Sequence, residues 1–120
     1  MILDGTSLSI QVCLDAGKST NDMDVSLDYL LWNTTGGPTK PASTRVATNG
    51  TTDVTVLGAG SISANFVADI LHMSVYNKDT ASKTATVKID TGSSEFIEVK
   101  QLLQVGESLT WDKGFGWRIL

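Results

Sequence analysis

The sequence has few of the residues on which disulfide, metal and most nucleophilic chemistry depend. Its 120 residues include one cysteine, one histidine and two prolines. With Cys13 alone, no disulfide forms within the chain, and a lone cysteine on a strand is usually a small packing residue. A chain of this length suits a single domain and buries a core without metals or disulfides. We therefore expect one domain with no cofactor and no metal site.

Charge and long apolar runs are also scarce. Charged residues make up 18% of the chain, the net charge is −4, and the nine basic residues are scattered. Without a basic stripe to neutralise phosphates, nucleic-acid binding has no support. No apolar run approaches the ~20 residues that span a bilayer, and the first residues lack the basic and apolar regions of a secretory signal. We expect no nucleic-acid or membrane partner and synthesis in a cytoplasm.

What the sequence does contain is an alternation of apolar and polar residues with a period of two, which is typical of strands. Turn residues separate short runs at intervals of roughly ten residues, as in sandwiches and small barrels. Within residues 66–77 we expect Val67, Leu71, Met73 and Val75 to share one face, which Asp69 interrupts and which is fully buried only after that residue. The pattern predicts an all-β fold, an antiparallel β-sandwich or small barrel. The clearest runs are Thr6–Leu14, Met23–Leu31, Phe66–Asn77, Thr84–Asp90 and Glu95–Leu103.

Both prolines and a glycine pair lie in residues 33–41, which predicts a loop or hinge. The hinge divides the chain into an N-terminal hairpin or arm, residues 1–48, and a β-sandwich module, residues 49–120, which together form one domain. An isolated hairpin is marginal in water, so the arm must pack on the module or on a neighbouring subunit. We expect Ser7–Leu14 to be an edge strand that can extend a neighbour's sheet.

The most tempting catalytic motif is Asp90–Ser93 (Asp-Thr-Gly-Ser), which resembles the signature of aspartic proteases. That chemistry needs two aspartates sharing one proton, and those enzymes place most of their fold after the aspartate, whereas 30 residues follow Asp90 here. Between two alternating runs, the motif predicts a hairpin turn. His72 lies within an apolar run and predicts a core or interface histidine, because no nucleophile elbow accompanies it. We expect no catalytic residue and no enzyme.

Acidic and aromatic residues suggest two further kinds of site. Asp22, Asp24 and Asp28 alternate along one strand, where they spread over roughly 20 Å at ~3.3 Å per residue and cannot converge on one ion. They predict a solvated or partner-facing acidic face. Trp32 and Trp111 are large aromatics of the kind that anchor interfaces. An exposed groove beside either tryptophan would indicate a glycan or protein ligand.

Residues 49–120 resemble a class of virion proteins in their order of strand and turn residues. They are similar to the small β-sandwich modules of tailed bacteriophages, especially capsid decoration (cement) proteins and head- or tail-fibre proteins. The resemblance implies a fold class and a virion setting rather than a catalytic activity. The stretches that carry it are Asn49–Leu57, Leu71–Thr80, Thr84–Asp90, Glu95–Lys100, Val105–Leu109 and Gly114–Arg118.

The resemblance implies a cement protein that binds the major capsid protein on the outer surface of the capsid. It also implies a homo-oligomer, and the habit of such proteins favours a trimer. The alternative is a fibre or adhesin module that binds a host surface glycan or protein. For attachment we expect the N-terminal segment, by strand addition and by apolar anchors. The expected partner-binding residues are Leu8, Ile10, Val12, Leu30, Leu31 and Trp32.

Overall fold

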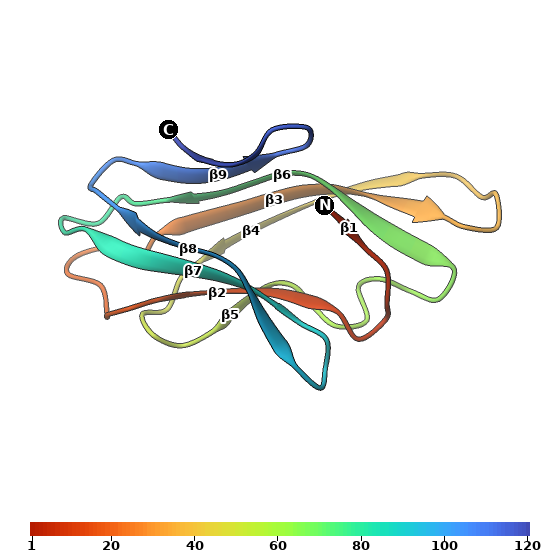
Figure 1. Ribbon diagram of the computed structural model, residues 1–120, viewed down its shortest axis with the longest axis horizontal. Coiled ribbons are helices and arrows are strands. Elements are labelled where there is room, and N and C mark those ends of the chain that lie inside the picture. Colours follow the sequence, from red (N-terminus) through yellow and green to blue (C-terminus); the bar gives the residue numbers. More distant parts are fainter.

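A computed structural model describes all residues, 1–120, and contains ten β-strands and no helix (Figure 1). The alternating residues form these strands, because side chains of period two line opposite faces of a sheet. The strands are β1 (Ile2–Leu3), β2 (Ser9–Leu14), β3 (Asp24–Asn33), β4 (Lys40–Ala47), β5 (Val54–Leu57), β6 (Phe66–Tyr76), β7 (Lys83–Asp90), β8 (Glu95–Leu103), β9 (Ser108–Asp112) and β10 (Gly116–Ile119).

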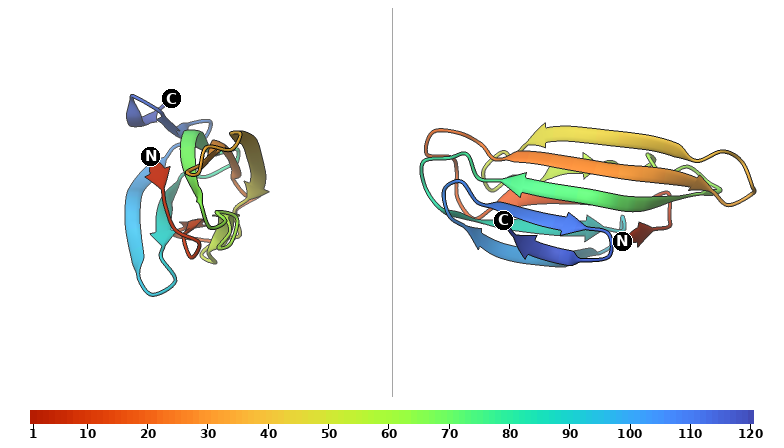
Figure 2. Two further views of the ribbon diagram at one scale, coloured as in Figure 1. Left: turned by 90° about the vertical axis from the view of Figure 1, so that its right-hand side faces the viewer. Right: turned by 90° about the horizontal axis from the view of Figure 1, so that it is seen from above.

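The strands form two antiparallel sheets that pack face to face as a β-sandwich, so the predicted fold class is confirmed. Sheet A has the order β10-β9-β6-β3-β4, with β1 paired to the free part of β6. Sheet B has the order β5-β2-β7-β8. Figure 2, seen from above, shows the five long strands of sheet A side by side, with β4 at one border and β10 at the other.

One apolar core of 20 residues fills the space between the sheets. It is built from the inward positions of the alternating runs, because burying these side chains is the main favourable term of folding. The inward residues of β7 belong to this core, since Ala85 and Val87 are buried and Ile89 packs against it. The largest fully buried side chains include Ile10, Met23, Leu27, Leu57, Ile62, Ile70, Met73, Leu103 and Leu109.

The predicted N-terminal hairpin is wrong, because its two strands lie in different sheets. β2 belongs to sheet B, where it pairs with β5 and β7, and β3 belongs to sheet A, where it pairs with β4 and β6. The chain therefore crosses from one sheet to the other between the two strands. Removing residues 1–32 would take a central strand from each sheet, so residues 49–120 are not a module that folds without them.

The proline and glycine segment is a turn within one sheet and not a hinge between two parts. β3 runs to Asn33 and β4 begins at Lys40, and the two strands pair from Leu31↔Lys40 to Asp24↔Ala47. The turn is fastened locally, since the Asn33 side chain accepts hydrogen bonds from the backbone and hydroxyl of Thr35. Figure 1 shows this hairpin as the long right-hand end of the molecule.

A β-bulge in β6 reverses the side-chain alternation along that strand. Against β3, Asp28 pairs with His72 but the next residue, Tyr29, pairs with Ile70. Leu71 is therefore the extra residue on β6. A single inserted residue shifts every later side chain to the opposite face.

The bulge changes which residues of β6 reach the core. Met73 and Val75 are fully buried after it, as predicted, whereas Ala68 takes the inward position before it. The prediction that Val67 and Leu71 share this buried face is wrong, and both are half-buried. The alternation predicted for this run is therefore confirmed only for the residues after the bulge.

A buried polar cluster ties the loop between β2 and β3 to the turn after β6. The carboxylate of Asp79 is 1% exposed and accepts hydrogen bonds of 2.7–3.0 Å from the backbone N–H groups of residues 19–21. Thr80 N–H donates a fourth, and Lys83 Nζ lies 3.3 Å from Oδ2. These bonds, led by the one from Ser19, hold the pKa of Asp79 far below the ordinary aspartate value of 3.8.

Candidate functional site

The Asp-Thr-Gly-Ser motif forms the turn of the β7–β8 hairpin, as predicted. Asp90 pairs with Glu95 across the hairpin, and Thr91 N–H donates to the carbonyl of Ser94 at 2.9 Å. The Asp90 carboxylate accepts the N–H of Gly92, and Gly92 has a φ of 90°. Asp90 is thus used in a local Asx-type turn, which is a common role of aspartate at such positions.

The first strand of the predicted attachment segment is not available to a partner. β2 lies between β5 and β7, so the prediction that it is an edge strand is wrong. Its apolar residues Ile10 and Val12 are 1% and 0% exposed, and they face the core. Leu8 is half-buried and packs against the same core. The alternation that suggested a partner surface is the alternation that builds sheet B.

The other predicted anchors lie near the outer end of β3 and are more accessible. Leu30 and Leu31 are half-buried, and Leu31 packs against the core. Trp32 is 46% exposed, and its indole N–H donates to Oδ2 of Asp69 at 3.3 Å. Trp111 is only 9% exposed and belongs to the core. No groove is lined by either tryptophan.

Asp69 is a buried carboxylate on sheet A, with Trp32 on one side and Lys113 on the other. Lys113 Nζ donates to Oδ2 at 2.5 Å, whereas Oδ1 is buried without a hydrogen-bond partner. Burial alone would raise the pKa of Asp69, but the hydrogen bonds from Lys113 and Trp32 outweigh it and lower the pKa. Asp69 therefore fastens the β9–β10 turn and the indole of Trp32 to β6.

A row of charged side chains crosses the outer face of sheet A. Arg45 of β4 lies 3.1 Å from Asp28 of β3, and Asp28 faces His72 of β6. His72 Nδ1 lies 2.7 Å from Asp112 of β9, and Arg118 of β10 bonds the second oxygen of Asp112 at 2.9 Å. The only histidine therefore lies on an outer face, because it alternates with the buried Met73, so it is not a core residue; the alternative of an interface histidine stays a prediction.

The carboxylates of this row are held in their charged form. A hydrogen bond from the Ser43 hydroxyl, followed by one from Arg45, lowers the pKa of Asp28. The bond with His72, followed by that with Arg118, lowers the pKa of Asp112. Opposite charges pair across neighbouring strands at both ends of the row, Arg45 with Asp28 and Arg118 with Asp112, as on other stable sheet faces. It does not converge on one point in space, so it offers no catalytic constellation.

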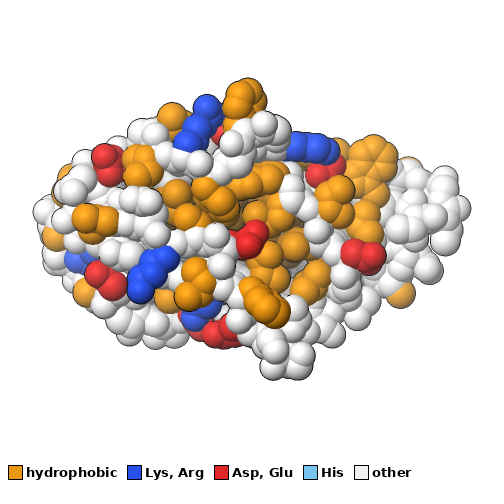
Figure 3. All heavy atoms as spheres, viewed as in Figure 1, with side chains coloured by type: hydrophobic (Ala, Val, Ile, Leu, Met, Phe, Trp, Pro, Cys, Tyr) orange, Lys and Arg blue, Asp and Glu red, His pale blue; other side chains and the backbone are white.

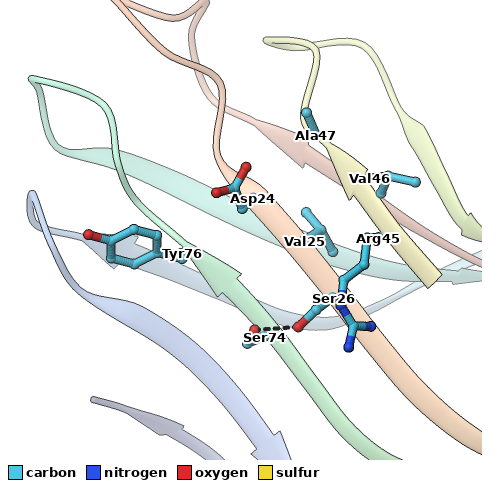
Figure 4. Close-up of a pocket in the computed structure, with 8 residues that line it drawn as sticks. All are labelled: Asp24, Val25, Ser26, Arg45, Val46, Ala47, Ser74 and Tyr76. Carbon is cyan, nitrogen blue, oxygen red and sulfur yellow. Dashed lines mark hydrogen bonds between the residues drawn. The ribbon is translucent and has the colours of Figure 1, made fainter. Parts of the chain in front are cut away.

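The structure has one surface hollow, of about 420 Å³, next to this row on the outer face of sheet A (Figure 4). Its floor contains a hydroxyl pair, Ser26 Oγ and Ser74 Oγ, which are 2.7 Å apart. Tyr76 and Arg45 stand on opposite sides of it, with Asp24 between them. The residues come from three neighbouring strands: Asp24 and Ser26 of β3, Arg45 and Ala47 of β4, and Ser74 and Tyr76 of β6.

Asp22, Asp24 and Asp28 do not form one acidic site. Each has a separate basic partner: Lys18 for Asp22, Lys78 for Asp24 and Arg45 for Asp28. No group of three or more Asp, Glu, His or Cys side chains lies close enough to hold a metal ion. The structure also contains no helix long and apolar enough to cross a membrane.

Cys13 lies half-buried on the outer face of sheet B, beside Asp53 and Lys88. Burial, followed by the hydrogen bond with Asp53, raises the pKa of the thiol. Because the thiolate is the reactive form, this environment makes Cys13 a weaker nucleophile than a free cysteine. Lys88 Nζ is instead committed to Asp53 at 2.7 Å and to Glu95 at 3.6 Å.

Exposed apolar side chains also occur on the side of the sandwich bordered by the edge strands β8 and β10. Phe96 pairs with Ile89, which packs against the core, yet Phe96 is 58% exposed. Ile119 pairs with the buried Leu109 and is 41% exposed. Half-buried Val99 and Trp117 pack against the core beside them. We name Phe96, Val99, Trp117 and Ile119 the open side.

The open side exists because the two sheets do not close there as they do opposite. At the other border, β4 and β5 lie against each other. On the open side, β9 and β10 cover only part of β8, and the short β1 occupies the rest of the sheet A border (Figure 1). Figure 3 shows apolar atoms gathered across the middle of this side, with one acidic group among them and other charged groups around them.

No family model matches this sequence, and neither a curated protein nor a solved structure matches it.

The sequence analysis predicted neither the open side nor the hollow. Phe96 and Ile119 lie at positions that alternation assigns to the core, so nothing local marks them as uncovered. The hollow combines residues 24–26, 45–47 and 74–76, which only the sheet topology brings together.

Proposed function

We propose that the chain is a non-enzymatic virion structural protein of a tailed bacteriophage, a cement protein that decorates and stabilises the capsid. The virion setting follows from the resemblance of residues 49–120. The observation that carries the attachment is the open side, where inward-facing side chains of β8 and β10 are left uncovered. Exposed apolar side chains at core-facing positions, as on β8 and β10, are a feature of interaction sites in soluble proteins.

Attachment through the open side is favourable for a simple reason. Full burial of a Phe or Ile side chain contributes about 1.5–3 kcal/mol relative to leaving it fully exposed. Phe96 and Ile119 are two such side chains, and 58% and 41% of their surfaces remain to be buried by a partner. Such a contact is weak for one subunit but is multiplied when a homo-oligomer engages several sites at once. The partner is the major capsid protein on the outer surface of the shell.

The rest of the molecule fits a mechanical role. The sandwich has a single continuous core, and its long interstrand loop is fastened by the buried Asp79 cluster. The charged residues of sheet A neutralise one another in a row across the strands. None of these clusters presents a nucleophile with a base, so the chain acts by binding.

The proposal is tested with expanded shells that lack decoration. The unmodified protein is expected to co-sediment with the shells and to raise the temperature at which they break. The double variant Phe96→Asn/Ile119→Asn is expected to lose at least about tenfold in affinity, because apolar burial is lost at two positions. Val105→Asn is the matched control, since Val105 is equally exposed but lies in the β8–β9 turn. Failure of the unmodified protein to bind shells contradicts the proposal.

A further inference from the structure

We propose that the hollow on the outer face of sheet A binds a neutral sugar, a hexopyranose unit of a glycan. The hollow is separate from the open side and is not needed for attachment. Its volume of about 420 Å³ falls within the range of small-ligand sites. It lies on three paired strands rather than on loops, so its side chains are held by the sheet.

An aromatic side chain, Tyr76, forms one side of the hollow. Tyr76 is the last residue of β6, and its ring is 40% exposed although it is a large apolar surface. A hexopyranose has one face made of C–H groups, and such a face packs on an aromatic ring while the hydroxyls stay polar. Aromatic rings supply large contact area at low conformational-entropy cost. Tyr76 therefore suits the apolar face of a sugar.

Hydrogen-bond donors and acceptors line the rest of the hollow. The Asp24 carboxylate contacts Lys78 through Oδ1, at 2.8 Å, so its second oxygen is available to accept a hydroxyl. The Ser26–Ser74 hydroxyl pair both donates and accepts on the floor. Arg45 adds N–H donors on the far side (Figure 4). Adjacent hydroxyls of a sugar need this mixture of donors and acceptors.

The positive and negative charges at the hollow are equal in number, which favours a neutral ligand. One anion, Asp24, and one cation, Arg45, line the hollow. Each is already paired with a residue outside the lining, Asp24 with Lys78 and Arg45 with Asp28. The four charges sum to zero, so the hollow offers a charged ligand no net attraction, whereas a neutral polyol forms charge-assisted hydrogen bonds with both lining groups.

The experiment records amide chemical shifts of the labelled protein during titration with lactose, maltose, cellobiose, mannobiose and N,N′-diacetylchitobiose at millimolar concentrations. At least one of these sugars is expected to shift amides within residues 24–26, 45–47 and 74–76, with saturation. Tyr76→Ala is expected to weaken that binding at least about tenfold, and Tyr76→Phe less than about threefold, because the ring carries the contact. Phe115→Ala is the matched control, since Phe115 is an exposed aromatic outside the hollow.

Three results would overturn the inference. The first is that none of the five sugars shifts amides at the hollow. The second is that sugar binding is unchanged in Tyr76→Ala. The third is that galacturonate and glucosamine, which carry a charge, bind more tightly than every neutral sugar. The Tyr76 variants leave the open side intact, so their attachment to undecorated shells should equal that of the unmodified protein. A loss of sugar binding and a loss of shell binding are thus separate outcomes.

Discussion

Asp79 and Lys83 form a buried ion pair, with Nζ 3.3 Å from Oδ2 and side chains that are 1% and 6% exposed. The pair is not isolated, because the same carboxylate accepts four backbone N–H groups. It joins a loop near residue 20 to the β6–β7 turn about 60 residues later in the chain. A buried charge that is paired and hydrogen-bonded in this way is tolerated, whereas one that loses its partner is costly.

The first prediction concerns this cluster. In Asp79→Ala the four N–H groups and the Lys83 ammonium lose their acceptor, so the melting temperature should fall by at least about 10 °C. The measurement is thermal unfolding followed by circular dichroism. Asp4→Ala is the control, because Asp4 is exposed, and its melting temperature should change by less than about 2 °C. Equal melting temperatures in the two variants would show that the cluster does not hold the fold.

The second prediction is a loss of stability in acid. The folded-state pKa values of Asp28, Asp69, Asp79 and Asp112 all lie below the ordinary value of 3.8. A group with a lowered folded pKa stabilises the fold fully above its unfolded pKa, and this stabilisation is lost as the pH falls below that value. The melting temperature should therefore be nearly constant from about pH 5 to 7 and decrease below about pH 4.

The variant Asp79→Asn separates the contribution of this one carboxylate. It keeps the size of the side chain but has no proton to gain, so its melting temperature should depend less steeply on pH below about pH 4. Parallel curves for the variant and the unmodified protein across that range would contradict the assignment. The measurement is a series of thermal melts at constant ionic strength.

The third prediction concerns the β7–β8 turn. Gly92 has a φ of 90°, and a Cβ there would lie 3.3 Å from Cβ of Ser7. Gly92→Ala should reduce the free energy of unfolding by about 1–2 kcal/mol, because a side chain is strained in this backbone region. Gly17→Ala is the control, since Gly17 lacks a positive φ and has open space around it. Urea unfolding should show a change of about 0.5 kcal/mol or less for Gly17→Ala; a similar cost at both glycines would rule out strain at the turn.

The local parts of this fold could be predicted from the sequence, because they depend on neighbouring residues. The β7–β8 hairpin follows from alternation on both sides of Asp90–Ser93, and the structure confirms both strands and the turn. The partners of β2 could not be predicted in the same way. Alternation shows that Ile10 and Val12 share a face, but it does not show which strands flank them.

The bulge and the two candidate surfaces depend on non-local geometry. One extra residue at Leu71 places Ala68 and not Val67 on the face of Met73, and no local pattern marks where a bulge falls. Asp24 was recognised as part of a wet face, but Tyr76 joins it only because β3 and β6 are neighbours in sheet A. Phe96 lies opposite Ile89, which packs against the core, yet the exposure of Phe96 depends on how far the opposite sheet extends.

The central claim is that the open side attaches the protein to its partner, and hydrogen exchange tests it most directly. Backbone exchange would be measured for the protein free in solution and bound to undecorated shells. We expect amides of β8 and β10 to gain protection on binding, whereas those of β4 and β5, at the opposite border, exchange as before. Protection confined to β4 and β5, or unchanged exchange in β8 and β10 of the bound protein, would contradict the claim.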